Sequence, residues 1–255
     1  MPIVPQILDQ MSNISKSQKK FMNLLFSTLF SFRGKANFLN LSRYAGCSEK
    51  TLRKNYRNPF DFEEFNHLLH LFFQEPAWFE EDDQPGILAA DTTFIKKSGK
   101  HTWRLDKFVH STTHRSEKGL EVSLVALIDP KNQALALSAE QTPAGDDESR
   151  VDFYLRHLQD SWPYWPPGIK YGVFDGYYSK VKFVDGVCEL GLDMIGKLRN
   201  DADLRYVYQG EQKARGARRK YDGKVDFIDW SRWEYLGELE ENISRVFQEK
   251  NFNLV

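Results

Sequence analysis

The sequence predicts an α/β protein in which a mixed sheet with flanking helices follows an all-α region. Apolar residues recur at helical spacing in the segments between residues 18 and 73. From residue 86 onward, short β-type runs appear, and the later ones alternate with amphipathic helices. The run EPAWFEEDDQPG, residues 75–86, is acidic and punctuated by proline and glycine, so it marks the boundary between the two regions.

The all-α region contains a candidate helix-turn-helix. Residues 18–32 predict one helix, which Gly34 closes, and residues 60–73 predict a later one. Between them lie a short helix ending near Gly46 and a second helix capped by Ser48, with Leu52 facing inward. Four basic residues face outward from the second helix: Lys50, Arg53, Lys54 and Arg57. This pattern is typical of a DNA-binding helix-turn-helix, and a plain helical hairpin is the alternative.

The second region predicts three consecutive strands followed by alternating helices and strands. The strands are expected at 86–95, 120–129, 134–141, 169–175 and 192–199, with helices at 148–160 and 179–191. The order β-β-β-α-β-α-β fits a ribonuclease H-like sheet, and it also fits other α/β sheets. Residues 205–228 predict an insertion that carries a β-hairpin.

The charge is strongly segregated, although the net charge is only −1. Residues 11–60 carry ten Lys or Arg against one acid, and residues 197–224 carry nine against four. Two basic islands indicate a polyanionic partner, whereas a single one would more simply be a solvated face. Cys47 and Cys188 form no CxxC pair, and no stretch is apolar for long enough to span a membrane. We therefore expect a cytoplasmic protein without a paired-thiolate zinc site.

Two aspartates occupy unusual positions in the expected strands. Asp91 lies within the first strand, and Asp175 ends the fourth, directly before Gly176. A carboxylate in an apolar strand is costly unless something balances its charge. The first and fourth strands of a ribonuclease H-like sheet are neighbours, so the two carboxylates would meet and offer the hard oxygen ligands that Mg²⁺ or Mn²⁺ prefers. Alternatively, each aspartate caps a turn at a strand end, but the two together favour a metal site.

Several longer strings carry a family resemblance. They are NFLNLSRY at 37–44, FDGYYSK at 174–180, IGKLRNDADLRY at 195–206 and GARRKYDGK at 216–224. With these strings the sequence resembles bacterial insertion-sequence DDE transposases from about residue 35 to about residue 243. The resemblance implies a ribonuclease H-like catalytic core in which Asp91 matches the first acid and Asp175 the second. It also implies Mg²⁺ or Mn²⁺ as cofactor, double-stranded DNA of element ends and target as partner, and a homodimer in the active complex.

The third acid of the triad is not found. The family places it in a Tyr-x2-Arg-x3-Glu-x6-Lys pattern on a later helix. Arg245 and Glu249 have the inner spacing, but Asn242 stands at the Tyr position and the chain ends before the Lys, so we treat this match as chance. We therefore expect a C-terminally truncated transposase. The alternatives are a catalytically inactive DNA-binding remnant, which would inhibit transposition, and a ribonuclease H-like nuclease unrelated to transposition.

The expected domain organisation has four parts. Residues 1–84 form a helical DNA-binding domain, 85–204 the first part of the catalytic core, 205–243 a basic β-rich insertion and 244–255 an atypical tail. The insertion contributes a second set of candidate phosphate-backbone contacts: Lys213, Arg215, Arg218, Arg219 and Lys220.

Overall fold

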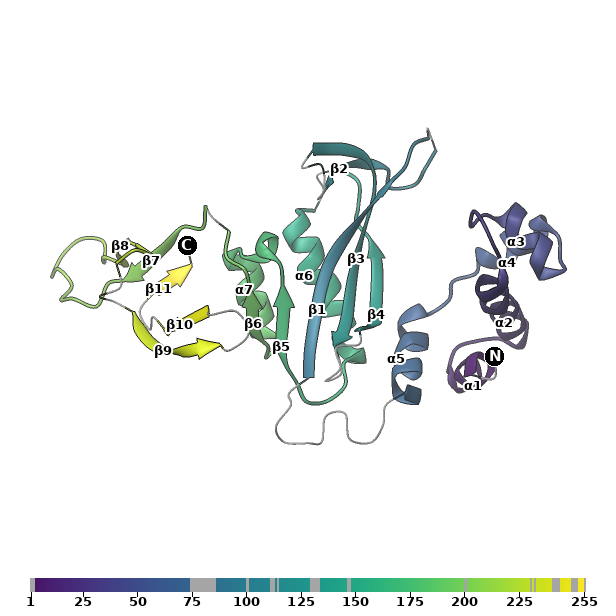
Figure 1. Cartoon of the computed structure of the whole chain (residues 1–255), viewed down its shortest axis with the longest axis horizontal. Coiled ribbons are helices and arrows are strands. Elements are labelled where there is room, and N and C mark those ends of the chain that lie inside the picture. Colours follow the sequence, from purple (N-terminus) through teal and green to yellow (C-terminus); the bar gives the residue numbers. More distant parts are fainter. Residues whose placement is uncertain are drawn as a thin grey trace.

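The computed structural model shows a helical N-terminal part followed by a mixed sheet with helices on one face (Figure 1). It describes residues 3–73, 86–99, 101–110, 113, 115–128, 134–145, 148–199, 201–229, 231, 233–239, 244–248 and 252–254. Among these residues, no helix has both the length and the apolar character that crossing a membrane requires.

Five helices form the N-terminal part. They are α1 (Ile3–Gln10), α2 (Lys16–Ser31), α3 (Phe38–Ala45), α4 (Glu49–Tyr56) and α5 (Phe62–Phe73). The side chains of Ser15, Asn37 and Ser48 cap α2, α3 and α4 by accepting a hydrogen bond from a backbone N–H three residues on. Gly46 ends α3 with a φ of 63°, a left-handed conformation that glycine adopts without strain.

The apolar faces of these helices meet in one core. Leu52 of α4 is fully buried there, as the sequence predicted, beside Leu25 and Leu41. Phe65 of α5 packs in the same core, while Asn66 donates to the carbonyl of Leu137 in the sheet. Helix α5 therefore joins the helical part to the sheet.

The main sheet has six strands. They are β1 (Gly86–Lys96), β2 (Asp106–His110), β3 (Arg115–Ile128), β4 (Ala134–Gln141), β5 (Ile169–Phe174) and β6 (Asp193–Gly196). The neighbours run β2-β3-β1-β5-β6, and β4 pairs with β3 on the same edge as β2. Pairs among β1 to β4 are antiparallel, and β1-β5 and β5-β6 are parallel. This order is compatible with the predicted ribonuclease H-like sheet.

Helices α6 (Arg150–Ser161) and α7 (Val181–Glu189) cover one face of the sheet. Alternate residues of the central strands, among them Leu88, Val125 and Phe174, point to that side and pack with Phe153 and Phe183 in the main core. The intervening residues point to the opposite side, which we call the open face. Leu124, Val173 and Ile195 are 38%, 36% and 49% exposed there.

Several elements were not predicted individually from the sequence, among them α1 in the helical part and β2 in the main sheet. Helix α1 buries apolar residues at positions 4, 7 and 8, and Met11 directly after it is buried in the same core, but Pro5 near its start obscures the pattern. Strand β2 carries the buried Phe108 in a short run of mixed polarity, and it forms only because β3 extends back to Arg115 and pairs with it. The remaining predicted helices and strands are present, with bounds shifted by a few residues.

Small sheets follow β6. Strands β7 (Leu204–Val207) and β8 (Tyr221–Lys224) pair antiparallel, and β11 (Phe252–Leu254) adds to β7. Strands β9 (Glu234–Leu239) and β10 (Ser244–Gln248) form a separate pair. Arg245 therefore lies in a strand rather than on the helix that the triad pattern requires, while Glu249 lies outside the described residues.

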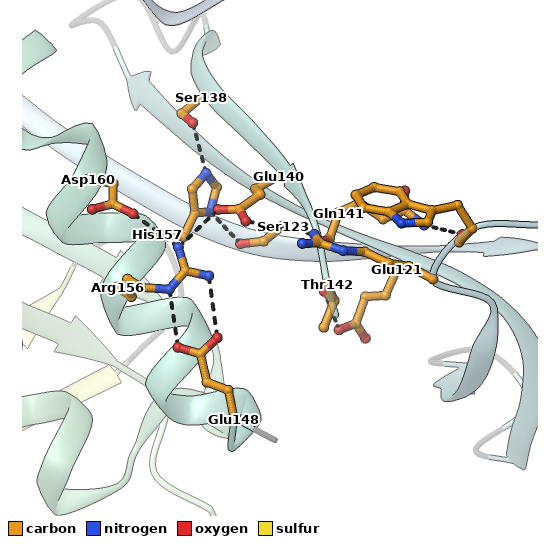
Figure 2. A network of polar contacts seen from close by, with 12 residues as sticks. Glu121, Ser123, Ser138, Glu140, Gln141, Thr142, Glu148, Arg156, His157 and Asp160 are labelled. Atoms are coloured by element: carbon orange, nitrogen blue, oxygen red, sulfur yellow. Dashed lines mark hydrogen bonds and ion pairs between the residues drawn. The ribbon is translucent and has the colours of Figure 1, made fainter. Parts of the chain in front are cut away.

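A buried polar chain connects α5, the sheet and α6. The Ser138 hydroxyl donates to Glu63 Oε1 at 2.5 Å, so Nε2 of His157, 2.8 Å from the same hydroxyl, is the donor to it. Nδ1 of His157 then accepts from the Ser123 hydroxyl at 2.9 Å (Figure 2). Burial lowers the pKa of His157, although the charge of nearby Glu140 opposes this, so the neutral ring is the folded form.

This histidine predicts how stability depends on pH. The unfolded chain takes up a proton near the ordinary pKa of 6.5, and the folded protein does so only at lower pH. The contribution of neutral His157 to the free energy of unfolding is therefore complete above about pH 6.5. It decreases as the pH drops toward the folded-state pKa. Urea unfolding between about pH 5 and 8 should show this decline, and His157→Gln should make it shallower.

In the His157→Gln variant, stability should still decrease somewhat at low pH, because a second histidine behaves in the same way. Burial, and then the charge of His67, also lower the pKa of His70. Exposed His101→Gln is the matched control and should keep the wild-type slope. A slope unchanged by His157→Gln would contradict the neutral buried ring.

Candidate metal centre

The pairing of β1 with β5 places Asp91 and Asp175 side by side. The parallel register aligns Ala89 with Val173 and Ala90 with Phe174, so the next residue on each strand is an aspartate. Ala90 and Phe174 are buried in the main core, so by strand alternation both aspartates belong to the open face. Both are exposed. The structure thus brings the two predicted acids to adjacent positions, Asp91 within β1 and Asp175 directly after the carboxyl end of β5.

Each aspartate uses one oxygen in a local backbone contact. Oδ1 of Asp91 accepts from its neighbour Thr92 N–H at 2.7 Å, and Oδ1 of Asp175 accepts from Tyr177 N–H at 2.8 Å. The second contact caps the short 3₁₀ helix η2 (Gly176–Tyr178). Both carboxylates keep further lone pairs, and hard oxygen donors at one exposed edge fit Mg²⁺ or Mn²⁺. Turn capping and metal binding are therefore compatible roles for Asp175.

A tyrosine below the acid pair was not predicted. Tyr178 is 2% exposed and packs on Phe174 and Phe183. Within the described part of the chain, its hydroxyl has no hydrogen-bond partner. Burial raises its pKa, and the charges of Asp91 and then Asp175 raise it further, so Tyr178 stays a neutral donor close to the acids. Tyr178 lies in the FDGYYSK string that carries the family resemblance. The sequence does not reveal that the η2 turn places its side chain beneath the acid pair.

Basic side chains flank the same edge of the sheet. Lys197 directly follows β6 and is exposed, and its carbonyl lies beside Gly176, where an added Cβ would come within 3.2 Å of it. Arg199 is held by Asp201 in an ion pair of 2.7 Å. A phosphate that approached the acid pair from this side would meet positive charge.

In the described part of the chain, the structure brings together the two predicted acids and no third acid beside them. Among the described residues, no group of three or more His, Cys, Asp or Glu side chains is placed to hold a metal ion. Two carboxylates alone leave most of the coordination shell of Mg²⁺ to water or to phosphate oxygens, which is how this ion often binds.

The candidate DNA-contacting residues of α4 are all exposed. Arg53 is engaged by Glu49 at 2.5 Å and stacks over Phe38, whose ring centroid is 5.0 Å from its guanidinium carbon. Lys50, Lys54 and Arg57 form no ion pair with described residues. The structure shows two helices joined by a Gly46 turn, and DNA recognition by α4 stays a prediction.

Residues 209–220 of the basic segment between β7 and β8 are also exposed. Arg219 is held by the carbonyl of Tyr221 and the carboxylate of Asp222, and its guanidinium stacks on Tyr208. Lys213, Arg215, Arg218 and Lys220 are exposed with it. Tyr206 is 5% exposed and packs in the small core with Leu204 and Val225. Its ring therefore offers no surface on which a nucleic-acid base could stack.

No family model matches the sequence, and no protein of curated function matches it. Among solved structures, the chain is similar to a piggyBac transposase synaptic complex with hairpin DNA, at 10% identity and a TM-score of 0.40, over 77% of this chain and 46% of that one. It is also similar to the Mos1 mariner paired end complex with Mn, at 11% identity and a TM-score of 0.28, over 76% of this chain and 63% of that one. The chain thus spans less than two thirds of either.

The acid pair predicts a metal-dependent change in stability. Mn²⁺ should raise the melting temperature of the wild-type protein, because a ligand that binds only the folded state stabilises it. Asp91→Asn and Asp175→Asn should each abolish this rise. Asn keeps the oxygen that accepts from Tyr177, so Asp175→Asn retains the cap of η2 and should melt close to wild type without metal.

The control is Asp193→Asn, which removes an exposed carboxylate from the opposite end of β6, where Asp193 pairs with Tyr171. Calorimetric titration of Mn²⁺ into all four proteins measures the same site directly. Binding that survives both variants at positions 91 and 175 would show that the two aspartates are structural.

Proposed function

We propose that this protein is a DNA transposase that carries out metal-dependent phosphodiester cleavage and strand transfer at the ends of an insertion element. The observation that carries the proposal is the placement of Asp91 and Asp175 on neighbouring parallel strands of a mixed sheet with this strand order. The resemblance of residues 174–180 to the second-aspartate motif of insertion-sequence transposases supports it.

The residues of the chain have distinct parts in this chemistry. Asp91 and Asp175 would hold Mg²⁺ or Mn²⁺ through their carboxylate oxygens. The chemistry that such an ion supplies is activation of an attacking water or 3′-hydroxyl and stabilisation of the leaving oxygen of the phosphodiester. The backbone N–H groups of Thr92 and Tyr177 orient the carboxylates, and Tyr178 keeps a neutral hydroxyl beneath them.

DNA would be held by positive charge on two parts of the chain. Helix α4 presents Lys50, Lys54 and Arg57 for the element end, and the segment between β7 and β8 presents Arg215 and Arg218 for the phosphate backbone. A homodimer would bring two element ends together.

A DNA-binding protein that does not cleave is the second candidate. It is favoured by the sequence, which has no Glu in the Tyr-x2-Arg-x3-Glu-x6-Lys pattern. A site with two of three carboxylates would lose one metal ligand and most of its activity. Such a protein would occupy element ends and inhibit transposition.

The two candidates differ in cleavage. The test uses duplex fragments tiled from the DNA on both sides of the coding sequence, incubated with the full chain and Mn²⁺. We expect nicking at one position on each side, lost in Asp91→Asn and Asp175→Asn while binding persists. Binding without nicking would establish the non-cleaving candidate, and nicking without preference for any fragment would indicate a general nuclease.

Helix α4 predicts a separate effect on DNA binding. Lys50→Ala combined with Lys54→Ala should reduce the slope of log affinity against log salt by about 2, because each lysine would release about one counterion. Arg53→Ala differs from the lysine variant because it should lower the melting temperature, since the side chain loses its contacts with Glu49 and Phe38. Fluorescence anisotropy over about 50–200 mM salt measures the slope. An unchanged slope in the Lys50 and Lys54 variant would remove α4 from the DNA interface.

A further inference from the structure

The ribbon formed by β2 and β3 carries two lysines directly opposite each other. The antiparallel register pairs Lys107 with Lys118, and both side chains are exposed. Like charges at directly opposed positions destabilise a ribbon. Neither lysine forms an ion pair with any described residue that would offset this repulsion.

The acids next to these lysines are engaged elsewhere. Asp106 accepts from the backbone N–H of Gly145 at 3.1 Å and from the backbone N–H of Lys107. These two hydrogen bonds lower the pKa of Asp106, and the charge of Arg150 lowers it further to a smaller extent. Glu117 binds Lys96 at 3.0 Å and pairs in register with the buried Phe108. Strand alternation therefore places Asp106 and Glu117 on the side of α6 and leaves the lysine pair on the other side.

That other side is the open face that holds the acid pair. Along β3, residues 119, 121, 123 and 125 are buried and the residues between them are not. Lys118 and Leu124 therefore share one face, and Leu124 is the register partner of Asp91. The positions between them on this face, Thr93, Ile95, Leu120 and Val122, carry no charge.

The spacing fits a nucleic-acid duplex. Lys118 and Leu124 are six residues apart on β3, and at about 3.3 Å per residue this is about 20 Å. A duplex rises about 3.4 Å per base pair, so the lysine pair would meet phosphates about six base pairs from the cleavage position. Phosphates over these lysines would also relieve their mutual repulsion, which water and salt do only in part.

We propose that Lys107 and Lys118 form a phosphate-backbone contact that holds duplex DNA along the open face, about six base pairs from the Asp91 and Asp175 pair. This inference rests on the proposed function, since it takes the acid pair as the site of cleavage. The contact carries no sequence information, because it reads phosphates alone. It differs from α4 and from the segment between β7 and β8, which lie outside the main sheet.

The test measures binding of a 30-base-pair duplex of arbitrary sequence to the full chain, by fluorescence anisotropy over a range of salt concentrations. Divalent metal is left out, so the result does not depend on the metal site. Lys107→Ala combined with Lys118→Ala should reduce the slope of log affinity against log salt by about 2. Its melting temperature should equal or exceed that of the wild type, because a repulsive pair is removed.

The matched control is Lys96→Ala combined with Lys182→Ala. It changes the net charge by the same amount, but these lysines are already paired, with Glu117 and Asp152 respectively. The control should keep the wild-type slope. An equal loss in both double variants would overturn the proposal, because net charge alone would then explain it.

An unchanged slope in the Lys107 and Lys118 variant would place the ribbon outside the DNA path and would also overturn the inference. The proposed function would survive that result, since cleavage near Asp91 is measured separately. A wild-type chain that does not bind duplex DNA would overturn both proposals. A second readout is hydroxyl-radical protection on a duplex fragment that carries the mapped cleavage position: the wild type should shield it about six base pairs from that position, and this protection should vanish in the Lys107 and Lys118 variant and persist in the control.

Discussion

The parallel pairing of β1 with β5 is the contact on which the rest of the site depends. It is held by Leu88, Ala90 and Phe174, which pack beneath α6 and α7 in the main core. Because the same pairing ends with an aspartate on each strand, burial of apolar area on one face sets two negative charges side by side on the other. The hydrophobic effect thus fixes an arrangement that electrostatics alone would oppose.

The two faces of β3 separate structural polar groups from groups available for binding. On the covered face, Glu121 accepts from Thr142, and Ser123 contacts His157 (Figure 2). Glu121 also accepts from the Tyr154 hydroxyl. Buried groups satisfied in this way make the strand a firm platform. On the open face, Lys118 is exposed and forms no ion pair with a described residue, so its ammonium group is accessible to a ligand.

The sequence was most informative where local rules decide the structure. Ser48, Gly46 and Leu52 were assigned correctly because capping, left-handed turns and helical spacing are short-range effects. The pairing of Asp91 with Asp175 needed the fold class as well. Strand β2 and the opposition of Lys107 to Lys118 depend on the pairing register of β2 with β3, and the place of Tyr178 depends on the η2 turn and on packing against Phe174, none of which composition and periodicity encode.

Two like-charge pairs on one face are better explained together than separately. Like charges on the opposed Lys107 and Lys118 weaken the ribbon, and a chain selected for stability alone would replace one of them. A duplex along the open face would relieve this repulsion, because its phosphates neutralise the lysines directly, and it would bring divalent cations to the acids. Under this proposal, the like charges on the open face serve binding at a cost in stability, while the covered face satisfies its polar groups and stabilises the fold.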